Sequence, residues 1–272
     1  MMAPGRVRRP LAGLRGALTF LTRVPVRALD GLRGEPASDS DRRVRDWDAF
    51  RSRPYSITLV GWIVGALVAV PFLASGAVPA PTVAVAYLVV VYLVTGVHHL
   101  DGVADLGDAL VVHGDADRRR EVLKDTTTGV GAVLAVALTV AGLGFAGLSL
   151  AAVPGGVAVA VVVAAEVGAK TGMAAMACFG RAAHVGLGSQ LTGVVGPRAF
   201  TFPAVLAVPT LLLTWPHPAA GFALVGALIG VAGPWWWARD NLEGVTGDVF
   251  GAANEIGRLV GLHAGVIAWT LW

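Results

Sequence analysis

The sequence is poor in charge. Only 14% of its 272 residues are Asp, Glu, Lys or Arg, whereas a soluble globular domain carries about 25%. Hydrophobic residues make up 55% of the chain, and the mean hydropathy is +0.68. This composition excludes an ordinary soluble domain and predicts a polytopic membrane protein.

Cysteine and net charge are also scarce. Cys178 is the single cysteine, so no disulfide can form within the chain. The net charge is +3, which is too small to favour nucleic acid as a partner. The partners that remain are the lipid bilayer and small molecules.

Long apolar runs divide the chain after residue 56. A membrane-spanning helix needs about 20 residues; four runs meet this length, and two fit with tilt or with a break at Pro209 or Pro234. The weaker apolar end, residues 259–272, is either a seventh span or a re-entrant segment. Residues 57–272 are therefore predicted to form an all-α transmembrane bundle of about six or seven helices, within a single membrane domain over residues 1–272. The six runs are Ile57–Gly76, Ala80–Val97, Val130–Leu150, Val157–Cys178, Thr201–Trp215 and Ala219–Trp237.

Residues 1–56 are rich in arginine and hold twelve of the nineteen Arg residues. The segment Leu11–Pro25 is too short and too charged to span the membrane, and it fits a helix lying in the interface. Residues 30–48 are polar with mixed charge, which is typical of a mobile linker.

The charged residues alternate along the chain in a way that predicts the topology. The turns near Ala77–Pro81, Ala151–Gly156 and Trp215–Ala219 carry none. Positive residues in short loops mark the cytoplasmic side of a membrane, so the charged segments are predicted to share the cytoplasmic face of the cell membrane, and the active site with them. Every Lys, Arg, Asp and Glu falls in residues 1–56, 98–128, 166–198 or 239–258.

Three aspartates dominate residues 98–128. If this stretch is helical, Asp101, Asp105 and Asp108 lie on one face, at i, i+4 and i+7. Like charges at this spacing repel one another, and the cost is larger at the end of a membrane span. We therefore expect a cation among them, and oxygen ligands suit Mg²⁺, Mn²⁺ or Ca²⁺.

The segment after these aspartates, Leu123–Gly129, precedes the third apolar run. Thr126–Thr128 are candidates to cap the helix that follows. The N-terminus of that helix and Lys124 would together attract phosphate. Asp125 is a further candidate ligand for the cation.

Two other polar groups are candidates for function. Asp248 and Glu255 share a helical face at i and i+7, with Gly251 between them. Glu166 and Lys170 have the i, i+4 spacing of an ion pair. Each also has a purely structural interpretation, a polar interfacial helix and a buried ion pair, and the residues alone leave both open.

Taken together, these motifs resemble the cobalamin synthase family (adenosylcobinamide-GDP ribazoletransferase). The resemblance implies an integral membrane enzyme that depends on Mg²⁺. Such an enzyme joins adenosylcobinamide-GDP to α-ribazole or its 5′-phosphate, forms adenosylcobalamin or its phosphate, and releases GMP. The matching pieces, in the family's order, are Phe20–Pro25, His99–Asp105 with Asp108, Leu123–Asp125 with Gly129, Gly186–Gly188, and Thr246–Ala252 with Glu255.

This chemistry gives the polar residues hypothetical roles. The metal ligands would be Asp101, Asp105, Asp108 and Asp125, and the metal would bridge the diphosphate. Asp105, Asp108 or His99 would accept the proton of the attacking hydroxyl. The residues predicted to bind substrate are Arg23, Lys124, Thr246, Asp248, Asn254 and Glu255.

Two other functions compete with this one. A CDP-alcohol phosphotransferase of lipid synthesis also uses aspartates at a membrane end, and the chain shares the pair Asp101-Gly102 with that class. A divalent-cation transporter would use the same acids as a ring in a pore. Small residues four apart, such as Gly61 with Gly65, allow close helix packing and would also suit a homodimer.

Overall fold

The computed structural model describes residues 5–26 and 39–272, which form helices and no named strand. The all-α prediction is therefore confirmed. The long helices are α3 (Tyr55–Val68), α4 (Ala80–Thr95), α5 (His98–Val111), α7 (Val130–Ala151), α8 (Gly155–Phe179), α11 (Ala219–Asn241) and α12 (Gly247–Leu271). The others are α1 (Gly5–Leu21), α2 (Asp39–Arg51), α6 (Ala116–Val122), α9 (Leu187–Leu191) and α10 (Thr201–Ala207), with the 3-10 helices η2 (Val70–Ala74), η3 (Pro197–Phe200) and η4 (Val208–Leu212).

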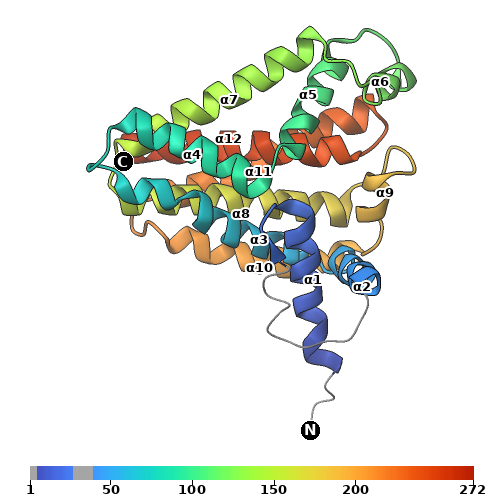
Figure 1. The fold of residues 1–272 in the computed structure, drawn as a ribbon, viewed down its shortest axis with the longest axis horizontal. Helices are drawn as coiled ribbons and strands as arrows, with labels where there is room; N and C mark the ends of the chain where they lie inside the picture. The colour runs from blue at the N-terminus through green and yellow to red at the C-terminus, as the bar shows by residue number, and fades with distance from the viewer. Residues whose placement is uncertain (1–4, 27–38) are drawn as a thin grey trace.

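The long helices other than α5 run side by side, as Figure 1 shows, with α6 and α9 at one end of the bundle and the C-terminus at the other. We call the end that carries α6 and α9 the polar end. Helix α12 packs against α11, α8, α5 and α7, so it lies at the centre of the bundle.

Four helices are long and apolar enough to cross a membrane. A fifth span results if α4 and α5 are taken together, although α5 turns away from α4 by 96°. These helices fit a membrane protein, and their number is close to the predicted six or seven. The four are Tyr55–Ala74, Val130–Ala151, Gly155–Phe179 and Ala219–Asn241.

The prolines decide which apolar runs are continuous. The run Thr201–Trp215 does not form a full span, because α10 gives way to the 3-10 helix η4 next to Pro209. In contrast, α11 continues through Pro234 without a break. A break at one of these two prolines was predicted, and only the first occurs.

The C-terminal region corrects the predicted organisation. The acidic stretch up to residue 258 and the weak apolar end after it were treated as separate segments. They form one helix, α12, of 25 residues. The charged residues of its middle turns therefore lie inside the bundle, and the same holds for Glu166 near the middle of α8.

The N-terminal helices α1 and α2 pack against each other, and α1 also packs against α3. Helix α1 confirms the predicted helix over Leu11–Leu21, while its position in the membrane interface stays a prediction. Helix α2 contradicts the predicted linker over residues 39–48; the rest of that linker lies outside the described residues. The two helices are joined by Arg15 and Asp46, whose side chains pair at 2.9 Å, and by the Phe20–Trp47 ring contact at 5.3 Å.

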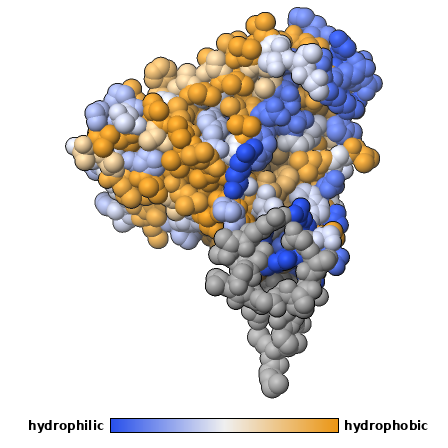
Figure 2. Space-filling model, viewed as in Figure 1, coloured by the Kyte–Doolittle hydropathy of each residue, from blue (hydrophilic) through white to orange (hydrophobic). Residues whose placement is uncertain are grey.

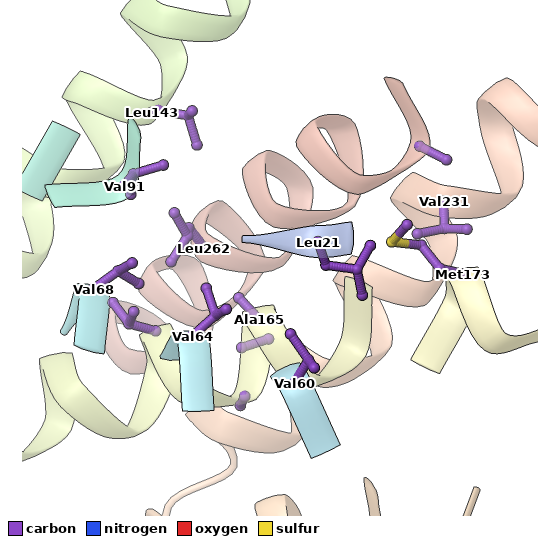
Figure 3. Packing of buried hydrophobic residues seen from close by; sticks show 14 of the residues in the cluster. Leu21, Val60, Val64, Val68, Val91, Leu143, Ala165, Met173, Val231 and Leu262 are labelled. Atoms are coloured by element: carbon purple, nitrogen blue, oxygen red, sulfur yellow. The ribbon is translucent and has the colours of Figure 1, made fainter. Parts of the chain in front are cut away.

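Glycines allow the helices to approach closely within this chain. A Cβ on Gly61 or Gly65 would lie 2.9 Å from a Cα atom of α8, and one on Gly230 would lie 2.7 Å from the Ile256 carbonyl oxygen of α12. Figure 3 shows Val60, Val64 and Val68 of α3 in the same core as Ala165 of α8. Because these glycines already face helices of the same chain, they give no support to the predicted homodimer.

The outside of the bundle is apolar. Leu138 and Phe145 of α7 and Ile229 of α11 are each more than 60% exposed. Large apolar side chains in such positions suit contact with lipid rather than water. Figure 2 shows that the hydrophilic residues on this face gather over the polar end. The distribution of polar side chains therefore directs attention to that end.

Candidate functional site

Helices α5 and α12 touch through their backbones near the polar end. A Cβ on Gly102 would lie 2.5 Å from the carbonyl oxygen of Asp248, and one on Gly251 would lie 3.1 Å from the Cα atom of His99. These two glycines therefore bring together the two acidic segments that the sequence predicted to form one site.

Three carboxylates near this contact lie close enough for their charges to interact. Asp101 and Asp105 come from α5, and the negative charges of Asp248, Asp101 and Asp108 all act on Asp105. Burial raises the pKa of the Asp248 carboxyl in the first turn of α12, and the charge of Asp101 raises it further, against a lowering hydrogen bond from Thr246. No described Lys or Arg forms an ion pair with any of the three. The cluster therefore attracts cations.

Asp108 has a different role from its neighbours. Its Oδ2 accepts a hydrogen bond from the Gly129 N–H at 2.7 Å, and its Oδ1 accepts one from the Ala132 N–H at 2.8 Å. These amides are at the start of α7, so Asp108 caps a neighbouring helix. The predicted cap by Thr126–Thr128 is wrong, because the N-cap residue of α7 is Gly129 and carries no capping side chain.

Asp125 and Lys124 are exposed in the loop before α7. Asp125 Oδ1 accepts a hydrogen bond from the Thr127 N–H at 3.0 Å, and this bond holds the pKa of the Asp125 carboxyl below its ordinary value. The structure therefore turns Asp125 toward its own loop. Its role as a metal ligand and the role of Lys124 in binding phosphate stay predictions.

Arg23 reaches the start of α5. Its backbone N–H donates to the Val94 carbonyl at 2.7 Å. A Cβ on Gly96 would lie 2.7 Å from Arg23 Nε and 3.2 Å from His98 Nδ1, which is why a glycine, with a φ of 74°, joins α4 to α5. The predicted phosphate-binding arginine thus lies beside the first residue of the acidic helix.

The other residues predicted to bind substrate are buried. Thr246 is the N-cap of α12, and its Oγ1 accepts from the Val249 N–H at 3.3 Å and donates to Asp248 at 3.2 Å. Asn254 and Glu255 are 0% exposed. Of this group only Asp248 is partly exposed to solvent. The other three side chains are buried and contact protein neighbours.

A buried polar network lies behind the carboxylates, and sequence reasoning found only half of it. The predicted ion pair is present, with Lys170 Nζ and Glu166 Oε2 at 2.8 Å. Arg258 was missed; it donates to Glu166 and, at 2.6 and 2.7 Å, to both oxygens of Glu255. A signal was available, since Arg258 stands three residues after Glu255 in an apolar stretch, where an ionisable residue calls for a partner.

At the surface, hydrogen bonds from α6 also connect the segment that follows α5 with the turn that precedes α12. Arg120 of α6 donates to the Leu242 carbonyl at 2.9 Å and to Glu243 Oε2 at 2.8 Å. Glu243 has a φ of 62°, which is uncommon for a residue with a side chain. The loop that follows α5 is therefore fastened to the turn that leads into α12.

The comparisons with known proteins agree with this arrangement. Residues 13–266 match the family model described as cobalamin-5-phosphate synthase. This chain belongs to the cobalamin-5-phosphate synthase family. The comparison with solved structures found no match.

Curated relatives of this chain cover 72–96% of its length. A protein of Halorubrum lacusprofundi is 48% identical over 269 residues, which are 96% of this chain and 98% of that protein. One of Halobacterium salinarum is 58% identical over 197 residues, 72% of this chain and 99% of that protein. One of Haloquadratum walsbyi is 40% identical over 268 residues, 96% and 99%. All three carry the name adenosylcobinamide-GDP ribazoletransferase.

The carboxylates at the α5–α12 contact fit a divalent cation in one particular way. Within residues 5–26 and 39–272, no group of three or more His, Cys, Asp or Glu side chains is arranged to hold a metal. Mg²⁺ is commonly bound through one or two carboxylates together with substrate phosphates. Asp101, Asp105 and Asp248 are oxygen donors that repel one another, so they suit an ion that arrives with a diphosphate rather than a closed protein cage.

A cavity of this family member lies away from these carboxylates. It has a volume of about 710 Å³ and includes Trp235, Trp236, Arg181, Arg239 and Glu243 in its walls. None of the residues predicted to act in the site lines it. We therefore place the chemistry at the α5–α12 contact, on the basis of its carboxylates.

Proposed function

We propose that this protein is an adenosylcobinamide-GDP ribazoletransferase. It would transfer the cobinamide phosphate of adenosylcobinamide-GDP to α-ribazole or its 5′-phosphate, with release of GMP. The observation that carries the proposal is the membership of the family together with the carboxylates of α5 and α12, which lie side by side at the polar end. Relatives of 40–58% identity carry the corresponding name.

The reaction exchanges one phosphorus–oxygen bond for another. The ribazole hydroxyl oxygen bonds to the phosphorus that carries cobinamide, the bond to the bridging diphosphate oxygen breaks, and GMP leaves with that oxygen. The hydroxyl proton must pass to a base. Asp105 is our candidate, because burial and then the surrounding negative charges favour its protonation.

Charge neutralisation is the main task of the site. When bound, Mg²⁺ would supply positive charge to the diphosphate and to the departing GMP. Asp101 and Asp248 would hold the ion and leave Asp105 free to accept the proton, and the Arg23 guanidinium beside His98 would contact phosphate oxygens. Lys124 would add a second cation from the loop before α7.

The site is proposed to face the cytoplasm. The polar end carries the Arg-rich segments around α6 and α9, and positive loops stay on the cytoplasmic side. Both substrates are polar, soluble molecules, and adenosylcobinamide-GDP carries a charged diphosphate, so the side that carries the cations and carboxylates is the side on which they would be met.

A product assay tests the proposed function. Purified protein in lipid is given adenosylcobinamide-GDP with α-ribazole, or CDP-diacylglycerol with an alcohol, and GMP, CMP and the corrinoid product are measured. We expect GMP and adenosylcobalamin in equal amounts, only with Mg²⁺, and a loss of about 100-fold or more in Asp101→Asn. Asp115→Asn is the matched control, because Asp115 only caps α6, with its Oδ1 3.0 Å from the Arg118 N–H, and Asn caps equally well. Release of CMP instead of GMP would identify the lipid-synthesis chemistry.

A further inference from the structure

His99 lies where α5 meets the buried network of α8 and α12. Its side chain is 5% exposed, and its Nδ1 lies 3.2 Å from Asn254 Nδ2. In a neutral imidazole one ring nitrogen donates and the other accepts, and the neighbours decide which. The contacts beyond Asn254 therefore determine what His99 can do.

The first step is the charge state of Glu255. Arg258 Nη1 donates to both of its oxygens, at 2.7 and 2.6 Å. Arg258 also donates to Glu166, and Lys170 donates to the same carboxylate at 2.8 Å. Two cations thus balance two carboxylates in a site that is 0% exposed. Glu255 is ionised here, and an ionised carboxylate only accepts hydrogen bonds.

The second step is the orientation of the Asn254 amide. Asn254 Nδ2 is 3.1 Å from Glu255 Oε1, and a carboxylate oxygen at that distance requires a donor rather than the amide oxygen. The same NH₂ group faces His99 Nδ1. Nδ1 therefore accepts a hydrogen bond, and the proton of the neutral ring is on Nε2.

We propose that His99 is a fixed hydrogen-bond donor, through Nε2–H, to the anionic diphosphate, and that it is not the general base. This inference rests on the proposed function for the identity of the anion. Among the described residues, no side chain accepts a hydrogen bond from His99 Nε2. The ring packs against His98 with centroids 4.3 Å apart, and Arg23 lies beside His98, so one side chain separates the His99 ring from the proposed phosphate-binding cation.

The network has a defined task in this arrangement. Asn254 is a positioning residue that sets the tautomer of His99, and Glu255 and Arg258 set the orientation of Asn254. The sequence suggested His99 as a base and Asn254 and Glu255 as substrate ligands. In the structure, Glu255 contacts Asn254 and Asn254 contacts His99, which is left with Nε2–H as a hydrogen-bond donor. Asp105 then remains as the proton acceptor.

Nitrogen NMR tests the tautomer without any turnover. Protein labelled with ¹⁵N-histidine is reconstituted in bilayers, and the His99 signals are assigned by their absence in His99→Gln. We expect a protonated Nε2 and an unprotonated Nδ1 in the wild-type protein without substrate. A proton on Nδ1 overturns the proposal, whatever reaction the protein catalyses.

Paired variants test the function of the donor. In His99→Gln the side-chain NH₂ group reaches the place of Nε2, whereas in His99→Asn it reaches only the place of Nδ1. Since a hydrogen bond to a charged group contributes roughly 10- to 100-fold, we expect kcat/KM within about tenfold of wild type for Gln and a loss of about 100-fold for Asn. Equal values for the two variants overturn the proposal.

A variant of the positioning residue completes the test. Asn254→Leu removes the hydrogen bond to Nδ1, so we expect signals of both tautomers and a loss of roughly tenfold in kcat/KM. Thr58→Val is the control, because it removes another buried contact, Thr58 Oγ1 to Thr171 Oγ1 at 3.3 Å, away from His99. A single Nε2-protonated tautomer in Asn254→Leu would show that Asn254 does not position His99.

Discussion

The aspartates of α5 are alike in sequence but different in their contacts. Asp108 uses both carboxylate oxygens to accept from backbone amides at the start of α7, whereas the charges of Asp101 and Asp105 interact with that of Asp248 near the helix contact. Helical spacing places all three on one face and cannot separate a cap from a ligand, because the neighbouring helix decides which oxygens remain free.

The cap formed by Asp108 predicts a stability effect. Asp108→Ala leaves the Gly129 and Ala132 amides without their acceptor, so we expect the free energy of unfolding to fall by about 1–2 kcal/mol. Asp108→Asn keeps one acceptor oxygen and should lose less. Urea unfolding in detergent, followed by circular dichroism, measures both, and equal stability of Asp108→Ala and wild type would remove the capping role.

The buried arginine predicts a larger effect. Arg258→Leu leaves Glu166 and Glu255 with one cation between them in a site closed to water, which costs about 3–5 kcal/mol. Arg118→Leu removes an exposed ion pair with Glu121 at 2.9 Å and should cost less than about 1 kcal/mol. Similar unfolding curves for the two variants would contradict the account of the network.

At the scale of elements, the contact of α5 with α12 organises the site. The period of Asp101, Asp105 and Asp108 predicted α5, and the spacing of Asp248 and Glu255 predicted a common face on α12. The sequence did not show that the Glu255 end of this face is buried inside the bundle. The pattern of charges predicted residues 239–258 to lie at the cytoplasmic face, but in the bundle Glu255 is buried and paired with Arg258, which also donates to Glu166.

The glycine at this contact can be tested directly. A side chain at residue 102 would meet the Asp248 carbonyl oxygen at 2.5 Å, so Gly102→Val must move α5 away from α12. We expect GMP release to fall at least tenfold and the protein to lose about 1–3 kcal/mol. Gly156→Val is the control, since a Cβ there meets nothing within 4 Å. Normal activity of Gly102→Val would show that the two helices need not touch.

At the scale of the whole molecule, composition and apolar runs predicted a helical membrane protein, and the structure bears this out. The four or five candidate spans are close to the predicted six or seven. The difference arises because Pro209 divides one run and α4 ends after 16 residues. Run length alone does not show where a helix turns. Charges that pair inside the bundle, such as Glu166 with Lys170, also looked like loop charges when counted along the sequence.

The proposed topology can be measured with cysteine labelling. Cys178 is buried, so added cysteines report their own position. Ala77→Cys lies in an exposed turn between α3 and α4, and Asp117→Cys lies on α6 at the polar end. We expect a membrane-impermeant maleimide to label Ala77→Cys in intact cells and Asp117→Cys only after permeabilisation. The opposite pattern would place the site outside the cell.

Manganese binding tests the central claim, that carboxylates from α5 and α12 jointly hold a cation that holds a diphosphate. Mn²⁺ is titrated into the purified protein with and without the GDP-activated substrate, and the free ion is counted by electron paramagnetic resonance. We expect binding to tighten when the diphosphate is present, and to weaken by roughly 10- to 100-fold in both Asp101→Asn and Asp248→Asn, while Asp115→Asn behaves as wild type. Unchanged binding in Asp101→Asn and Asp248→Asn would contradict the claim.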